Sequence, residues 1–162
     1  MNTIELVQRI IDDFHLVIPV DLDKVIGSFA DIRMEYGCDI EQDGVVEKRG
    51  DEYIIRIKNK RVSIDDPNGY RDRFTIAHEL GHLFLGHIKN HEKLYREGAN
   101  ELEYEANDFA ANLLMPQSEF IRSIYSNLDE DGYCDLEEVS KQFRVSISAV
   151  KTRGKFLGVF SW

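Results

Sequence analysis

The segment from residue 73 to residue 87, RFTIAHELGHLFLGH, most constrains the fold. On a helical wheel of about 100° per residue, its apolar side chains fill all but one narrow sector. With Phe74 at 0°, that sector holds His78, His82 and Glu79, at about 40°, 80° and 140°. A surface helix would show the reverse proportions. The sequence therefore predicts a central, buried helix with a single polar window.

The three residues of this window form the H-E-x-x-H pattern. Positions four apart lie on one face of a helix, so the imidazoles of His78 and His82 can bind one metal ion. Glu79 can then sit beside the open position of the metal as a general base. The alternative is a chance occurrence of a short pattern, but chance does not explain the apolar surroundings. We interpret the segment as part of a zinc site.

A second helix, expected over residues 101–115 and stopped by Pro116, offers the third ligand. Its residue Glu103 falls on the apolar, inward side of the wheel. The other acidic residues fall on the polar side: Glu101, Glu105 and Asp108. An isolated carboxylate on a buried face is unfavourable unless it is paired or bound to metal. Glu103 is therefore the expected third ligand.

The sequence leaves an alternative for Glu103 and suggests a supporting residue for the site. The alternative role for Glu103 is a buried ion pair with Arg71 or Arg73. Asn107, one turn further on, can orient a ligand imidazole. Two histidines and one glutamate leave the fourth zinc position for water, which is the catalytic arrangement.

Other polar residues nearby are less clearly placed. The longer zinc pattern with a third histidine would need one at position 88, which is Ile88. On a continued helix, His87 falls at about 220°, away from the window, and is expected to be structural. His91 lies in the polar segment 89–100, which we expect to be a loop and a candidate rim of the cleft. The candidates for stabilising an oxyanion remain open: Tyr70, Tyr95, Tyr104 and His91.

The remaining elements predict an α+β fold. Apolar spacing indicates a helix from Val7 to Phe14, and Asp21 is the expected N-cap of a short second helix. Strands are expected at 32–36, 44–48 and 53–58, with 61–64 as a possible fourth, and a turn at 66–69 leads into the central helix. Short connections favour a small, mostly antiparallel sheet packed on that helix, as in a zincin-like domain. Its edge strand either holds an extended peptide or only supports the helix.

The tail has the spacing of a helix-turn-helix over residues 136–154. Reading DNA needs a basic recognition helix; Lys151, Arg153 and Lys155 supply some charge, but residues 129–138 are strongly acidic. We favour packing or docking of a partner protein over DNA reading. The expected organisation is a metallopeptidase domain at 1–125 and a helical appendage at 126–162 packed on it. Phe160 and Trp162 are expected to be packed or to form a contact patch.

The net charge of −10 argues against a nucleic-acid binder, since such affinity rests on basic contacts to phosphate. It allows a basic protein partner. The first residues show no basic, apolar leader, and no apolar run reaches the length of a membrane span. Cys38 and Cys134 lie far apart without ligand spacing, as expected of reduced thiols. We expect a cytoplasmic protein that does not bind membranes.

Taken together, RFTIAHELGHLFLGH and EYEANDFAANLLMP resemble the ImmA/IrrE family of bacterial and phage metallopeptidases, over about residues 61–120. The resemblance implies a catalytic zinc on His78, His82 and Glu103. It puts Asn107 in the orienting position, where related peptidases more often have Asp. It also implies site-specific cleavage of helix-turn-helix repressors, as by phage or mobile-element anti-repressors.

In the predicted reaction, zinc lowers the pKa of its water toward about 7 and Glu79 takes the proton. The rival hypothesis is a metal-stabilised module that sequesters a repressor or toxin partner without cutting it. The presence of Glu79 speaks against that rival, because a site without catalysis needs no base.

Overall fold

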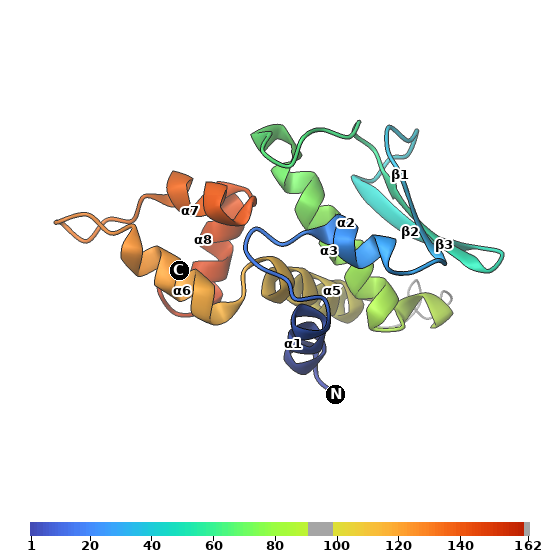
Figure 1. Cartoon of the computed structure of the whole chain (residues 1–162), viewed down its shortest axis with the longest axis horizontal. Helices are drawn as coiled ribbons and strands as arrows, with labels where there is room; N and C mark the ends of the chain where they lie inside the picture. Colours follow the sequence, from blue (N-terminus) through green and yellow to red (C-terminus); the bar gives the residue numbers. More distant parts are fainter. Residues whose placement is uncertain (91–98, 161–162) are drawn as a thin grey trace.

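Two long helices, α3 (Tyr70–Phe84) and α5 (Ala99–Leu114), pack against each other at the centre of the molecule (Figure 1). The computed structural model describes residues 1–90 and 99–160. Gly81 allows the close approach of the two helices, because a Cβ there would lie 3.0 Å from Phe109 Cδ1 and 3.2 Å from Ala106 Cα. Since α3 carries the H-E-x-x-H residues and α5 carries Glu103, this contact assembles the two parts of the predicted site.

The sheet lies on one side of α3 and packs on it through β2 and β3 (Figure 1). Its strands are β1 (Ile32–Glu35), β2 (Gly44–Arg49) and β3 (Glu52–Ile57), in the order β1-β3-β2. β3 pairs antiparallel with β2 and parallel with β1. The expectation of a mostly antiparallel sheet is therefore wrong for one of the two pairings. The chain between β1 and β2 crosses to the far edge, and the β2–β3 hairpin then returns β3 to the middle.

Shorter elements surround this centre. α1 (Thr3–Asp13) packs on α5, and α2 (Leu22–Gly27) has the predicted N-cap, with the Lys24 N–H donating to Asp21 at 3.1 Å. A 3₁₀ turn, η1 (Pro67–Gly69), precedes α3, and another, η2 (His87–Asn90), follows it. Residues 61–64 form no strand. Within residues 1–90 and 99–160, no helix is both long and apolar enough to cross a membrane.

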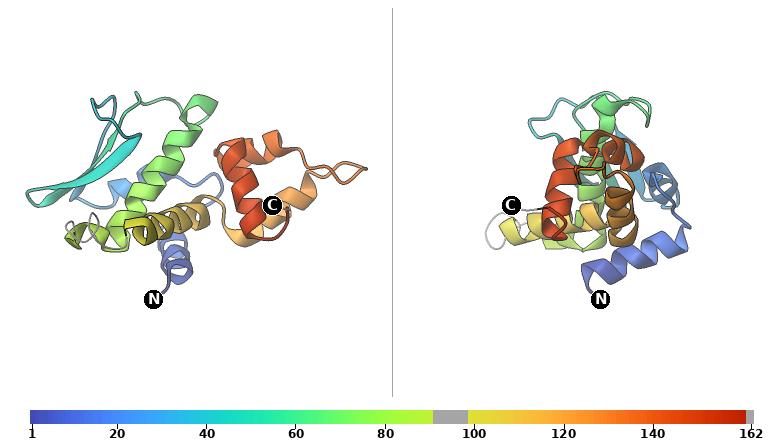
Figure 2. Two further views of the ribbon diagram at one scale, coloured as in Figure 1. Left: turned by 180° about the vertical axis from the view of Figure 1, so that it is seen from behind. Right: turned by 90° about the vertical axis from the view of Figure 1, so that its left-hand side faces the viewer.

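The C-terminal helices lie on the side of α3 opposite the sheet (Figure 2). They are α6 (Gln117–Ser126), α7 (Leu136–Phe143) and α8 (Ile147–Phe156). The turn between α7 and α8 contains Arg144 in the left-handed region, and the Ser146 side chain caps α8. Phe160 packs against the core, whereas Trp162 lies outside the described residues.

Two buried arginines connect these helices to the rest of the chain. Arg73 of α3 donates to the carbonyls of Arg144 and Val20, each at 3.0 Å. Arg153 of α8 donates to the Met115 carbonyl and to Asn112 Oδ1, each at 3.1 Å. Arg153 is therefore committed to the interior and adds nothing to a basic surface on α8.

The close packing at Gly81 gives a stability prediction. We expect Gly81→Val to lower the free energy of unfolding by about 1–2 kcal/mol, because overpacking costs about 1–3 kcal/mol and the helix-propensity gain recovers only about 0.5 kcal/mol. Thermal denaturation should show a midpoint lower by about 2–8 °C. Gly27→Val is the control, because a Cβ at Gly27 meets nothing within 4 Å. Equal midpoints for the two variants would contradict the proposed role of Gly81.

Candidate metal centre

Potential ligand atoms of three side chains, two on α3 and one on α5, lie close together. His78 Nε2 lies 2.9 Å from Glu103 Oε2, and His82 Nε2 lies 3.0 Å from Glu103 Oε1. The two Nε2 atoms are 3.1 Å apart. A tetrahedral zinc with bonds of about 2.0–2.1 Å holds neighbouring ligand atoms about 3.3 Å apart. The three side chains therefore fit a metal ion of this size with little movement.

The protonation of the site suits a cation. The His78 and His82 side chains are largely buried. Burial, together with the neighbouring His78, lowers the pKa of His82 to about 4, although Glu103 acts in the opposite direction. At neutral pH the His82 imidazole is therefore uncharged, and one of its ring nitrogens has a lone pair for a metal.

The position of Glu103 corrects one part of the sequence argument. Its side chain is 49% exposed and lies at the mouth of the site, not on a buried face. The alternative of an ion pair with a nearby arginine does not occur, because Arg71 pairs with Asp43 at 2.6 Å and Arg73 binds backbone carbonyls. The structure therefore does not support the reason for choosing Glu103, a buried face, although the Glu103 carboxylate does contact both imidazoles.

Glu79 lies beside this cluster, and a carboxylate oxygen of Glu79 lies within 4.8 Å of a ring nitrogen of His78 and of His82. It is buried and accepts a hydrogen bond from the Val46 backbone N–H of β2. Burial, followed by the charge of Glu103, raises the pKa of Glu79 to about 8, while the Val46 N–H acts to lower it. A bound cation would also lower this pKa and favour the carboxylate form that a base requires.

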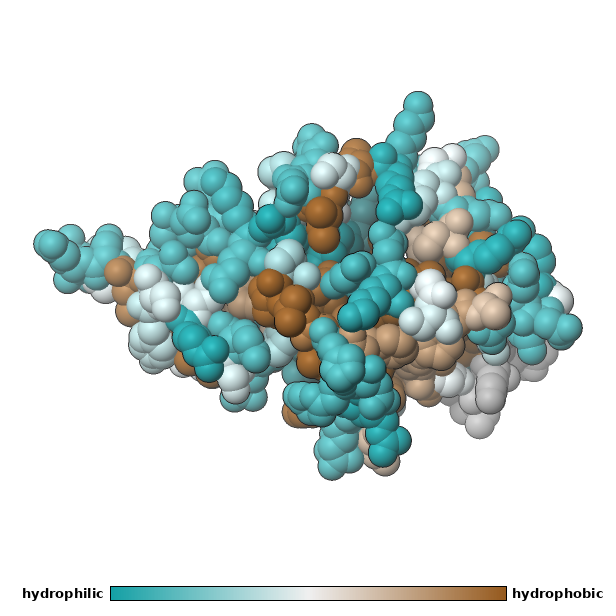
Figure 3. Space-filling model, viewed as in Figure 1, coloured by the Kyte–Doolittle hydropathy of each residue, from teal (hydrophilic) through white to brown (hydrophobic). Residues whose placement is uncertain are grey.

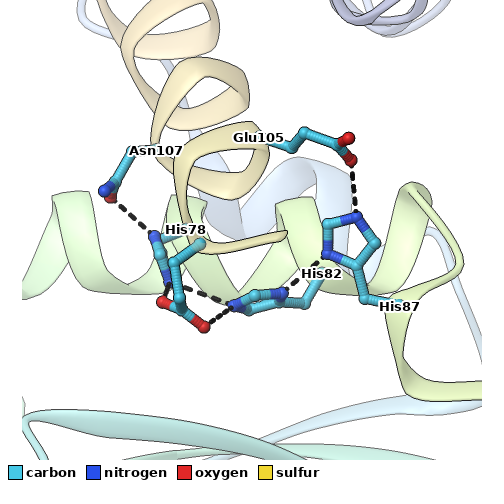
Figure 4. A network of polar contacts seen from close by, with 6 residues as sticks. His78, His82, His87, Glu105 and Asn107 are labelled. Atoms are coloured by element: carbon cyan, nitrogen blue, oxygen red, sulfur yellow. Dashed lines mark hydrogen bonds and ion pairs between the residues drawn. The ribbon is translucent and has the colours of Figure 1, made fainter. Parts of the chain in front are cut away.

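Asn107 contacts the outer nitrogen of one imidazole. Its Oδ1 lies 2.8 Å from His78 Nδ1 (Figure 4). Because an amide oxygen only accepts, a proton on His78 Nδ1 satisfies this contact, and a metal between Nε2 and Glu103 would then meet the Nε2 lone pair. The structure thus places Asn107 where the sequence analysis expected an orienting residue.

The placement of His87 differs from the expectation. The predicted direction, away from the window, assumed a helix continuing through residue 87. α3 instead ends at Phe84, and Gly86, at φ +77°, reverses the chain. His87 Nδ1 consequently lies 2.9 Å from His82 Nδ1, and its Nε2 lies 2.9 Å from Glu105 Oε2 (Figure 4). Glycine at a helix end is the sequence signal that would have indicated this reversal.

Two of the four oxyanion candidates, Tyr70 and Tyr104, are described by the structure. Tyr70 is buried at the start of α3 and Tyr104 is exposed on α5, and neither lines the cleft described next. His91, Tyr95 and most of the expected loop at 89–100 lie outside the described residues.

The candidate ligands His78, His82 and Glu103 lie in a cleft of about 530 Å³ between α3, α5 and the edge strand β2. Gly44 brings this strand close to α3, because a Cβ there would lie 2.5 Å from Thr75 Cγ2. The Lys58 N–H bonds to the Asp43 carbonyl, so alternate residues of this strand pair with β3. Gly44, Val46 and Lys48 then direct their backbone groups toward the open edge, as the Val46–Glu79 bond illustrates.

A family model described as the IrrE N-terminal-like domain, Peptidase_M78, matches residues 37–155. The match contains β2, β3, both site helices and the C-terminal helices to within one residue of the end of α8. No curated protein matches the chain. The match covers most of the sequence and includes all the residues of the cluster. The chain therefore belongs to the Peptidase_M78 family, a family of metallopeptidases, as its two motifs indicated.

Proposed function

We propose that this protein is a zinc-dependent endopeptidase that cuts a helix-turn-helix repressor at a specific site. Such an activity would make it an anti-repressor of the phage or mobile-element type. The observation that carries the proposal is the convergence of His78, His82 and Glu103 beside Glu79 in an open cleft. A repressor substrate also places the reaction in the cytoplasm.

The proposed ligands are His78, His82 and Glu103, and the proposed base is Glu79. Bound zinc would supply Lewis-acid activation of a water molecule and of the scissile carbonyl. Glu79 takes a proton from the attacking water and passes it to the leaving amine. The hydrogen bond from the Val46 N–H holds the Glu79 carboxylate in place for both transfers.

The edge of β2 is the proposed binding surface for the substrate backbone. Outward backbone groups at Gly44 and Lys48 can pair with an extended peptide, as an added strand pairs with a sheet edge. The cleft between β2 and α3 also contains the apolar side chains of Phe74, Val46 and Ile88. Backbone pairing would align the peptide, and these apolar residues would select a side chain.

Charge supports a basic substrate. The described residues that line the cleft include no lysine or arginine, although Asp43 is paired with Arg71 and Glu103 is a proposed metal ligand. The whole chain carries a net charge of −10, and the face seen in Figure 3 is predominantly hydrophilic. DNA-binding proteins present lysine and arginine to phosphate, so their recognition regions are basic. Complementary charge would favour the encounter of protease and repressor.

Co-expression with a candidate helix-turn-helix repressor, such as one encoded beside this gene, tests the proposal, with the intact mass of the repressor as the readout. We expect two fragments whose masses add to the whole plus one water. The same fragments should be absent when Glu79→Gln is co-expressed instead. An intact partner that co-purifies with zinc-loaded wild-type protein would refute cleavage and support the sequestering module.

A further inference from the structure

The side chains of His82, His87 and Glu105 form a line of contacts from the candidate metal site to the surface of α5. His82 Nδ1 contacts His87 Nδ1, and His87 Nε2 contacts Glu105 Oε2, each at 2.9 Å (Figure 4). The His87 side chain is 4% exposed, whereas the Glu105 side chain is 51% exposed. The buried members therefore depend on one another for hydrogen bonds, and the line of contacts ends on a carboxylate in contact with water.

We propose that His87 and Glu105 are positioning residues that fix the tautomer and the ring orientation of His82 for metal binding. This inference rests on the metal centre of the proposed function. It assigns a role to two residues outside the proposed ligand set and outside the pair formed by His78 and Asn107.

The direction of each hydrogen bond follows from the chemistry of the groups. A metal at the cluster requires the lone pair of His82 Nε2, so the His82 proton sits on Nδ1 and is donated to His87 Nδ1. His87 Nδ1 then accepts, which places the His87 proton on Nε2. That proton is donated to the Glu105 carboxylate, which only accepts. One arrangement of protons thus satisfies every contact in the line and leaves His82 Nε2 free for the metal.

The two histidine ligands are supported differently. His78 donates to the neutral amide oxygen of Asn107, whereas His82 reaches a negative charge through His87. A carboxylate behind a ligand imidazole raises the basicity of that ligand, and an amide does so less. Within the described residues, Glu105 is therefore the carboxylate that can raise the basicity of a ligand imidazole, that of His82, through His87. Metal affinity should depend on it despite its exposed position on α5.

The local backbone explains why this support comes from outside α3. On a continued helix, His87 would lie at about 220° of the wheel, away from His82 at about 80°. Gly86, in the left-handed region, instead follows the end of the helix and lets His87 lie against His82. A Cβ at Gly86 would meet nothing within 4 Å, so its requirement is the backbone angle and not space.

The test is the zinc affinity of the metal-free full chain, measured by competition with a chromophoric chelator. We expect His87→Leu to weaken zinc binding about 10–100-fold, the range for losing such support. Glu105→Gln keeps the shape and removes the charge, so its loss should be smaller, about 3–10-fold. Glu101→Gln, an equal charge change on the same helix, is the control and should stay within about twofold.

Further readouts separate positioning from folding. The metal-free Glu105→Gln variant should unfold at a temperature close to that of the wild type, whereas His87→Leu should unfold at a lower one, because it leaves a buried His82 nitrogen unpaired. The cobalt complexes of both variants should show shifted visible absorption bands. Asn107→Asp should restore part of the affinity lost in Glu105→Gln, because it supplies a carboxylate to the other imidazole. Wild-type affinity and cobalt spectra in both His87→Leu and Glu105→Gln would overturn the inference and leave the proposed function intact. Failure of the wild type itself to bind zinc or cobalt would overturn both.

Discussion

Replacing Glu79 with Gln is expected to lower the rate of peptide-bond cleavage by about 10²–10⁴-fold, the usual contribution of a general acid–base group. The amide has the same shape and can still accept the Val46 N–H, but it cannot take a proton from water. Zinc content should be unchanged, because Glu79 is outside the proposed ligand set. The loss should therefore appear in kcat at constant metal occupancy.

The same substitution should not unfold the protein. Burial raises the pKa of Glu79 to about 8, so the metal-free fold disfavours the ionised carboxylate. In the wild type this group makes folding less favourable as pH rises from about 4.5 to about 8, and glutamine removes that dependence. The metal-free variant should be at least as stable as the wild type at pH 7. Glu119→Gln is the control for charge, and a zinc-loaded Glu79→Gln that cleaves within tenfold of the wild type would assign the proton transfer to another group.

Replacing Glu103 with Ala is expected to weaken zinc binding by about 10²–10³-fold. Four-ligand zinc sites provide about 10–16 kcal/mol, so an equal share per ligand is about 2.5–4 kcal/mol. Zinc at a hundredfold excess over its Kd stabilises a protein by about 2.7 kcal/mol, or about 5–11 °C at this chain length. The variant should lose this zinc-dependent shift at the same zinc concentration.

The exposure of Glu103 allows the effect of its removal on metal binding to be separated from any effect on folding. Because its side chain is half exposed, removing it should leave the melting temperature of the metal-free protein nearly unchanged. Differential scanning fluorimetry with zinc and with a chelator separates the two effects. Glu101→Ala is the matched control on α5 and should keep the full zinc shift. An undiminished shift in Glu103→Ala would place the metal on other residues.

The sequence predicted the parts of the site that depend on helical periodicity. The apolar wheel around His78, Glu79 and His82 corresponds to the central position of α3, and the inward faces of two helices bring Glu103 to the histidines. A helical wheel gives the direction of a side chain around the helix axis but not the depth of that residue in the core. Glu103 lies in the second turn of α5, where the inward face has reached the edge of the core and opens into the cleft.

Helical periodicity could not predict features that depend on a reversal of the chain or on the order of the strands. His87 was misplaced because the wheel was continued through Gly86. The parallel pairing of β1 was missed because short connections do not reveal which strand returns to the middle. The bond from Val46 to Glu79 requires both the sheet register and the packing of β2 on α3, and no local pattern encodes either.

The buried Arg73 has a consequence for the dynamics of the chain. One guanidinium binds the carbonyl before α2 and the carbonyl at the α7–α8 turn, and it lies one turn before His78 on the same helix. Detaching the C-terminal helices would strip a buried cation of an acceptor, which costs on the order of 1–3 kcal/mol or more. Local opening at the tail would therefore be coupled to the helix that carries the ligands. In hydrogen exchange, the amides of α7, α8 and α3 would exchange with similar protection, as one cooperative unit.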